Sequence, residues 1–220
     1  MTRQLDMRQQ GPASGSLKSV VIFLHGYGAD GADLLGLADP LAEHLPDTLF
    51  IAPDAPDPAQ GSGMGRQWFP LPWIDGSSEA EAAAGLEQAS SDLNAFLDKV
   101  MEDNDVSADE IAIVGFSQGS MMALDVVPRR KTAPAAIVAF SGRLLRPEAL
   151  EADAVSKPPI LLCHGDADEV VPFQEMGIAG ETLVDAGFDV YAHVMQGTAH
   201  GISPDGLSAA LGFLHEHLPK

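Results

Sequence analysis

The stretch Gly115-Phe116-Ser117-Gln118-Gly119 follows an apolar run at residues 111–114 and leads into a helix-favouring run at residues 119–124. A serine in the pattern G-x-S-x-G, placed between a buried strand and a helix, is typical of a nucleophile elbow. The two glycines fit this turn because the strand and helix backbones approach each other too closely for a Cβ atom. Such a pentapeptide also arises by chance in a chain with 22 glycines. The flanking strand and helix favour the elbow.

The composition limits the class of protein. A chain of 220 residues suits one domain with its own hydrophobic core. Twelve Lys and Arg against 32 Asp and Glu give a net charge of -20. This charge argues against nucleic acid and anionic membrane surfaces as partners, since both require a basic surface. We interpret the acidity as a solvated surface, and a role in attracting a cationic substrate has no other support in the sequence.

Cys163 is the single cysteine and cannot form an internal disulfide. It lies in an apolar run, where a buried thiol is expected rather than a reactive one. The first residues contain no apolar signal-peptide core, and no apolar run reaches the roughly 18 residues of a membrane span. We therefore expect a soluble, cytoplasmic protein with no stable membrane insertion. A homodimer is left open.

Strands and helices alternate along the chain. Continuous apolar runs, typical of strands covered on both faces of a parallel sheet, lie at residues 20–24, 48–52, 111–114, 136–140, 160–163 and 190–194. Helices are expected over residues 34–45, from the capping box at residues 78–81 onward, after the elbow, and over residues 173–186 and 204–218. Residues 1–17 are polar, with a short edge strand expected around Leu5 and Met7. The pattern predicts one α/β domain over residues 1–220 with a mostly parallel central sheet.

Residues 53–76 show neither a helical nor a strand period and contain several prolines and both tryptophans. Irregular segments of this length are often functional. Trp68, Phe69 and Trp73 either form an apolar wall over a cleft or plug the segment onto the core. The sequence does not separate these two interpretations.

Several polar segments directly follow predicted strands, at the sheet edge where parallel sheets bind ligands. A serine nucleophile needs a base, and the base needs an acid that fixes its tautomer. The chain order Ser117, then an aspartate, then His200 is the order found in α/β-hydrolases. Asp166 and Asp168 both follow a strand, and either could be the acid on this argument alone.

The chain resembles the phospholipase/carboxylesterase family over about residues 18–218. The motifs that carry the resemblance occur in family order: residues 24–30, 53–56, 66–69, 115–119, 164–172 and 200–201. The resemblance implies an α/β-hydrolase fold with a minimal lid or none, Ser117 as nucleophile, Asp168 as acid and His200 as base. It also implies an oxyanion hole formed by the backbone N–H groups of Leu24 and Gln118. Ser120, in place of a second glycine, and the run Pro70-Leu71-Pro72 depart from the family pattern.

The expected reaction is hydrolysis of carboxylic esters through an acyl-enzyme. A substrate pocket is expected to be lined by Met64, Trp68, Phe69, Leu71 and Val171. Activity should fall at acid pH as His200 protonates, because an unperturbed histidine titrates at about 6.5. A lysophospholipase or acyl-protein thioesterase with a long-chain pocket is the alternative. A non-catalytic binding protein would show damaged site elements, and the sequence shows none.

The other histidines fit structural roles. His25 and His164 are expected to hold their loops, while His215 and His217 are expected at the surface. No group of Cys, His and carboxylate residues has metal-ligand spacing. Neither a metal nor a cofactor is expected.

Overall fold

The computed structural model describes residues 2–60 and 65–220. Its centre is a seven-stranded sheet of order β1-β3-β2-β6-β7-β8-β9, in which only β1 runs antiparallel to its neighbour. The strands are β1 (Met7–Gln10), β2 (Ser19–Leu24), β3 (Thr48–Pro53), β6 (Ile111–Phe116), β7 (Ala136–Phe140), β8 (Ile160–Gly165) and β9 (Val190–Met195). The predicted, mostly parallel sheet is confirmed.

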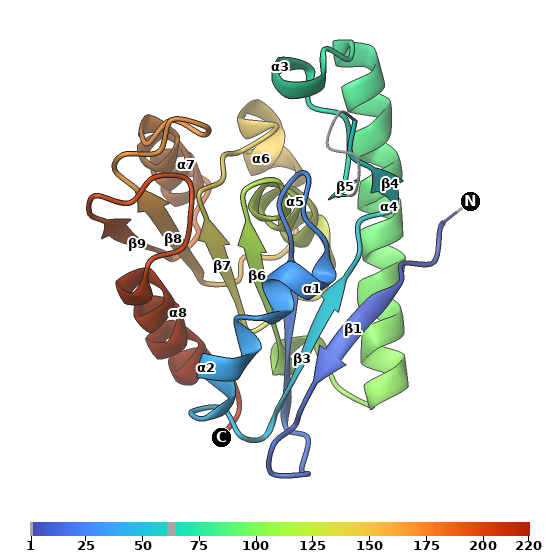
Figure 1. Ribbon diagram of the computed structural model, residues 1–220, viewed down its shortest axis with the longest axis vertical. Coiled ribbons are helices and arrows are strands. Elements are labelled where there is room, and N and C mark those ends of the chain that lie inside the picture. The colour runs from blue at the N-terminus through green and yellow to red at the C-terminus, as the bar shows by residue number, and fades with distance from the viewer. Residues whose placement is uncertain (1, 61–64) are drawn as a thin grey trace.

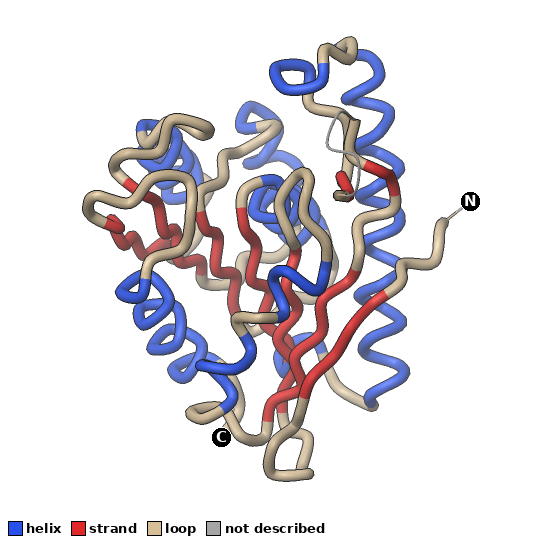
Figure 2. Tube along the Cα trace, in the orientation of Figure 1, coloured by secondary structure: helices blue, strands red, loops and turns tan. Residues whose placement is uncertain are grey.

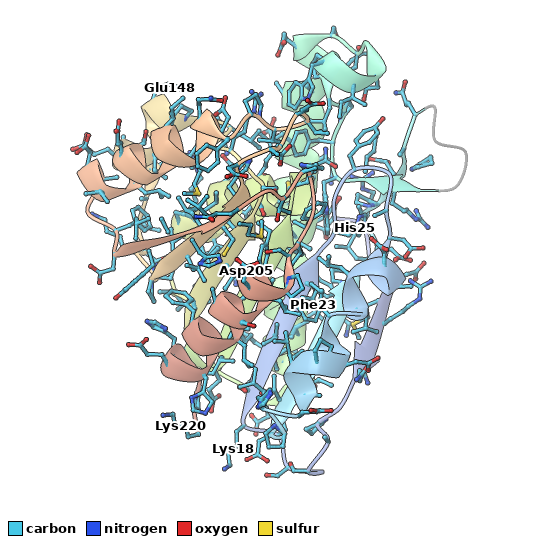
Figure 3. All side chains as sticks on the ribbon, turned by 60° about the vertical axis from the view of Figure 1, so that its left-hand side comes forward. Lys18, Phe23, His25, Glu148, Asp205 and Lys220 are labelled. Atoms are coloured by element: carbon cyan, nitrogen blue, oxygen red, sulfur yellow. The ribbon has the colours of Figure 1, made fainter. Side chains whose placement is uncertain are left out.

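Two layers of helices cover the sheet, one on each face (Figure 1). One layer holds α1 (Gly31–Leu35), α2 (Ala38–Ala42) and α8 (Pro204–His217), and it shares a core with Phe23, Phe50 and Phe140. The other layer holds α4 (Glu79–Asn104), α5 (Gln118–Val126), α6 (Pro147–Asp153) and α7 (Gln174–Asp185). Side chains fill the space on both faces (Figure 3). This double cover explains why the central strands are apolar without alternation.

The helix expected over residues 34–45 is in fact two short helices, α1 and α2. The Asp30 side chain caps α1 by accepting hydrogen bonds from the amides of Ala32 and Asp33. Pro40 has no N–H to donate, so it cannot lie in the interior of a continuous helix. In α2 it occupies the third position, where an amide needs no partner within the helix.

Residues 53–76 were expected to lack regular structure, and this was wrong in part. The segment forms the two-stranded sheet of β4 (Asp57–Pro58) and β5 (Arg66–Gln67), followed by the short helix α3 (Pro72–Asp75). These elements are too short to produce a period in the sequence. The helix α6 lies in a second stretch, before residue 157, where no helix was predicted.

Two other local predictions are confirmed. Ser78 and Glu81 form the capping box that opens α4, with the Ser78 hydroxyl and the Glu81 carboxylate each bonded to the other residue's amide. A short edge strand forms near the N-terminus as β1, beginning at Met7. Among the described residues, no helix combines the length and apolar character needed to cross a bilayer.

The segment before β1 is fastened to α4 through a buried carboxylate. Asp92 is fully buried and accepts hydrogen bonds at 2.7 Å from both the backbone N and the Nε of Arg3. Arg3 also pairs with Asp57, at 2.7 Å. These contacts join three segments that are far apart in the sequence.

Candidate active site

The turn between β6 and α5 has the geometry of an elbow. Ser117 has φ 52° and ψ -114°, a left-handed backbone region that a non-glycine residue rarely occupies. A Cβ on Gly115 would lie 2.5 Å from the Ser120 nitrogen, and one on Gly119 would overlap the Leu24 carbonyl oxygen. The predicted reason for both glycines is confirmed. This close packing enforces the strained turn and places the Ser117 side chain at the C-terminal edge of the sheet.

Ser117, His200 and Asp168 form one line of hydrogen bonds. His200 Nε2 lies 3.0 Å from Ser117 Oγ, and His200 Nδ1 lies 2.7 Å from Asp168 Oδ2. The three residues follow β6, β8 and β9, whose C-terminal loops gather at one edge of the sheet (Figure 2). The carboxylate can only accept at Nδ1, so Nδ1 carries the proton and Nε2 is left to accept the serine proton.

The surroundings of Asp168 keep its carboxyl group ionised. Burial alone would raise its pKa, but hydrogen bonds from His200 and from the amides of Val171 and Val170 outweigh this and hold the pKa below its usual value. Both amides donate to Oδ1 at 2.9 Å, which leaves Oδ2 for His200. Asp166 instead accepts from the amide of Gly197 at 2.6 Å and fastens two loops together. Of the two candidate acids, only Asp168 contacts His200.

His164 and His25 both hold backbone, as expected. His164 Nε2 donates to the Val171 carbonyl at 2.9 Å and lies 3.3 Å from Asp168 Oδ2. The Ala55 amide donates to His25 Nε2 at 2.9 Å, so the proton is on Nδ1, which donates to the Gly26 carbonyl at 2.8 Å. Burial lowers the pKa of His25, which keeps the ring neutral. Figure 3 shows His25 just beyond Phe23 of β2.

The backbone N–H groups near Ser117 differ in whether a hydrogen bond within the protein already uses them. Gln118 is the first residue of α5, where an amide has no partner within the helix. Leu24 is the last residue of β2 and pairs in register with Gly115, so its backbone lies within the sheet. A Cβ on Gly26 would lie 3.3 Å from the Ser117 Cβ, which places the residues after β2 against the elbow. Among the described residues, no hydrogen bond occupies the Tyr27 amide.

A set of buried hydrogen bonds joins residues 66–69 to both sides of the site, and sequence reasoning did not find it. Gln118 Oε1 accepts from the Trp68 amide at 3.0 Å, and Gln118 Nε2 donates to the Phe69 carbonyl at 2.7 Å. Trp68 Nε1 donates to the His25 carbonyl at 2.9 Å. We call these three contacts, with the Ala55–His25 bond, the clamp. The sequence hinted at these contacts only through Gln118, a long polar side chain next to the nucleophile in the elbow.

The predicted pocket residues lie mostly in the core. Trp68, Phe69 and Leu71 are 0%, 3% and 2% exposed, which favours the interpretation that they plug their segment onto the core. Val171 is also buried, beside Asp168. Met64 lies outside the described residues. Trp73, the third aromatic of that interpretation, is 50% exposed and is not plugged into the core.

The Ser120 departure is accommodated locally. Its hydroxyl donates to the Phe140 carbonyl at 2.7 Å, and Gly142 leaves room for its Cβ. At the end of α8, His215 is exposed, whereas His217 is only half-buried against Phe213. Within residues 2–60 and 65–220, no group of three or more His, Cys, Asp or Glu could hold a metal ion.

Comparisons with known proteins identify the family. A family model described as Phospholipase/Carboxylesterase matches residues 12–218. Acyl-protein thioesterase 1 of Neurospora crassa is 32% identical, over 95% of the chain and 91% of that protein. Esterase YpfH of Escherichia coli is 27% identical, over 92% of the chain and 84% of that protein. The crystal structure of esterase PE8 superposes with a TM-score of 0.93 at 42% identity, over 98% of the chain and 100% of that structure.

Proposed function

The chain belongs to the phospholipase/carboxylesterase family and is a carboxylic ester hydrolase, and from this premise we propose that Ser117, His200 and Asp168 carry the reaction. The observation that supports this most is the hydrogen-bonded line from Ser117 Oγ through His200 to Asp168 Oδ2. The expected resemblance and the α/β-hydrolase fold are confirmed by the family match and by the superposition.

The mechanism follows from the tautomer that Asp168 imposes. His200 Nε2 takes the Ser117 proton as Oγ attacks the ester carbonyl, and Asp168 stabilises the imidazolium that forms. The alcohol leaves with the proton from Nε2. Water, activated by the same nitrogen, then attacks the acyl-enzyme and releases the acid. The lowered pKa of Asp168 keeps it ionised throughout.

The oxyanion of the tetrahedral intermediate needs two N–H donors that face the position of the substrate carbonyl oxygen. The Gln118 amide, at the N-terminus of α5, is one. For the second donor we replace the predicted Leu24 with Tyr27, since Leu24 lies within the sheet and no residue of the described ranges bonds to the Tyr27 amide. In this arrangement the clamp fixes both donors, because it bonds to Gln118 on one side and to His25 on the other.

Thioester hydrolysis is the second candidate, favoured by the likeness to a protein named acyl-protein thioesterase 1. The same serine chemistry cleaves both bonds. Rates on 4-nitrophenyl esters from acetate to palmitate, compared with acyl thioesters of matched length, separate the two. Preference for short oxygen esters supports the carboxylesterase, and preference for long thioesters supports the alternative.

Covalent labelling tests the nucleophile. A fluorophosphonate should label the protein once, on the peptide that contains Ser117, and should abolish ester hydrolysis in proportion to labelling. The Ser117→Ala variant should take up no label. Labelling elsewhere with full loss of activity would contradict the proposal.

A further inference from the structure

Arg143 is singular among the arginines of the chain. Every other arginine donates to a carboxylate or, for Arg66, to a backbone carbonyl: Arg3, Arg8, Arg66, Arg129, Arg130 and Arg146. Arg143 has no such partner among the described residues, and its Nε is buried without a hydrogen bond. In a protein with 32 acidic and 12 basic residues, a guanidinium without an acid is unexpected as a purely structural feature.

Arg143 lies beside the elbow. It follows Gly142 after the end of β7, the strand next to β6 in the sheet. A Cβ on Gly142 would lie 3.5 Å from the Ser117 carbonyl oxygen, so the β7 loop packs directly on the residue that carries the nucleophile. The Oγ of Ser141 in the same loop is also buried without a partner.

The guanidinium is already positioned. Arg143 Cζ lies 4.3 Å from the ring centroid of Trp73 in α3, within the range of a cation–π contact. Trp73 follows Phe69, whose carbonyl accepts from Gln118, so the Arg143–Trp73 contact joins the β7 loop to α3 near the elbow. A ring over one face of a guanidinium leaves its in-plane N–H groups available to an anion.

We propose that Arg143, held by Trp73, binds a carboxylate on the substrate, so that the preferred substrates are esters carrying a second, ionised carboxyl group. This inference rests on the proposed function, because it assigns the substrate class of the same site. A single guanidinium balances one negative charge, and its planar fork matches a carboxylate. The net charge of -20 repels anions at long range, so recognition must come from this local contact.

Two matched pairs of esters test the proposal and locate the carboxylate. Monomethyl adipate against methyl hexanoate places it on the acyl side, and 4-acetoxybutanoate against butyl acetate places it on the alcohol side. For one pair, Arg143→Met should lower the ratio of kcat/KM for the anionic ester to that for the neutral ester by about tenfold to a hundredfold, mainly through KM. Arg143→Lys should recover part of the ratio, and Arg143→Glu should lower it further.

Lys157→Met is the matched control. Lys157 Nζ lies 6.0 Å from the ring centroid of Phe188, ahead of β8 and thus at the opposite end of the sheet, so removing this cation should leave the ratio unchanged. Equal losses on anionic and neutral esters in Arg143→Met would overturn the proposal, since they would show that Arg143 only fastens α3 to the β7 loop. An unchanged ratio in both pairs would overturn it as well.

A second measurement does not depend on a variant that folds. Adipate should inhibit wild-type hydrolysis of methyl hexanoate competitively, whereas 1,6-hexanediol at the same concentration should not; no inhibition by adipate counts against the proposal. If neutral esters are hydrolysed through Ser117 without any carboxylate preference, only this inference fails. If Ser117→Ala keeps its activity, the proposed function fails instead.

Discussion

The elbow around Ser117 and the segment 66–69 lie against each other, yet they are held in place by different means. The elbow is fixed by close backbone packing, with Gly115 and Gly119 against α5 and β2. Trp68 and Phe69 are held at the elbow by hydrogen bonds of the Gln118 and Trp68 side chains. Gly115 packs on the helix that directly follows it, whereas Gly119 packs on Leu24 of β2. The side-chain hydrogen bonds join residues 43 to 50 positions apart.

Because of this difference, we expect substitutions in the two regions to reduce activity in different ways. A substitution that removes the Ser117 hydroxyl stops the reaction but leaves the backbone packing of the elbow unchanged. A change in the clamp leaves every reacting group present but lets the N–H donors shift. Misplacement of reacting groups by about 1 Å can cost on the order of a hundredfold in rate. The predictions below use this contrast.

The largest effect is expected at the nucleophile itself. Ser117→Ala should lower kcat for a 4-nitrophenyl ester by on the order of a thousandfold or more, because no oxygen remains to attack the carbonyl. The melting temperature should not fall, since removing the hydroxyl breaks no structural contact other than that with His200. Steady-state kinetics and thermal unfolding measure the two. A variant with near wild-type kcat would exclude the serine mechanism.

The clamp should give the next largest effect. Gln118→Leu keeps the backbone amide of residue 118 but leaves the Trp68 amide and the Phe69 carbonyl buried and unpaired. Each unpaired group costs about 1–3 kcal/mol of folding free energy. We expect kcat to fall by about tenfold to a hundredfold with a smaller change in KM. Gln10→Leu, at an exposed hydrogen bond to Asp39, is the control and should change neither. Equal kcat in wild type and Gln118→Leu would show that the donors do not depend on the clamp.

Backbone packing should appear as a stability effect. Gly119→Ala places a Cβ against the Leu24 carbonyl and should cost about 1–3 kcal/mol of unfolding free energy, or more. Gly177→Ala in α7 meets no atom within 4 Å and should instead stabilise the protein by about 0.5–1 kcal/mol. Denaturant unfolding measures both. Loss of stability in the α7 variant would mean that glycine matters at position 177 for another reason.

The smallest effect is expected from the ring of His25. Its pKa is lowered in the folded state, mainly by burial, so the unfolded chain binds the proton more tightly. The resulting contribution to stability is full above about pH 6.5 and is lost as the pH falls from there. The contribution of Asp168, whose pKa is also lowered, is lost only below about pH 4.

Replacing His25 separates these two contributions. His25→Gln should reduce the drop in melting temperature between pH 7 and pH 5, because the glutamine does not titrate. An identical pH profile in the variant would assign the effect to other groups. Differential scanning calorimetry at closely spaced pH values gives the comparison.

The parts of the fold that could be predicted are those whose signals are local. The central parallel strands are continuous apolar runs because helices cover both faces. The elbow is a strand, a glycine-flanked serine and a helix. The chain order, together with the position directly after a predicted strand, left Asp166 and Asp168 as the acid. The family resemblance named Asp168, the one that contacts His200.

The failures have physical causes of their own. The break between α1 and α2 fits Pro40, which is tolerated only in the first turn of a helix. The elements β4, β5 and α3 are too short to show a period. The family resemblance implied the Leu24 amide as a donor, whereas the sheet register places the Leu24 backbone opposite Gly115. The hydrogen-bond partners of Gln118, and the lack of a carboxylate partner for Arg143 among the described residues, depend on which residues meet in three dimensions. The spacing of residues along the sequence does not reveal these contacts.

The Arg3–Asp92 contact has a practical consequence for handling the protein. Asp92 is buried in α4, and its carboxylate accepts hydrogen bonds from Arg3, in the segment before β1, and from Gln88. Proteolytic removal of the segment before β1 would leave this buried carboxylate without its cation, which destabilises the folded state. A nicked preparation would thus lose heat resistance during storage although every group at the catalytic edge is still present.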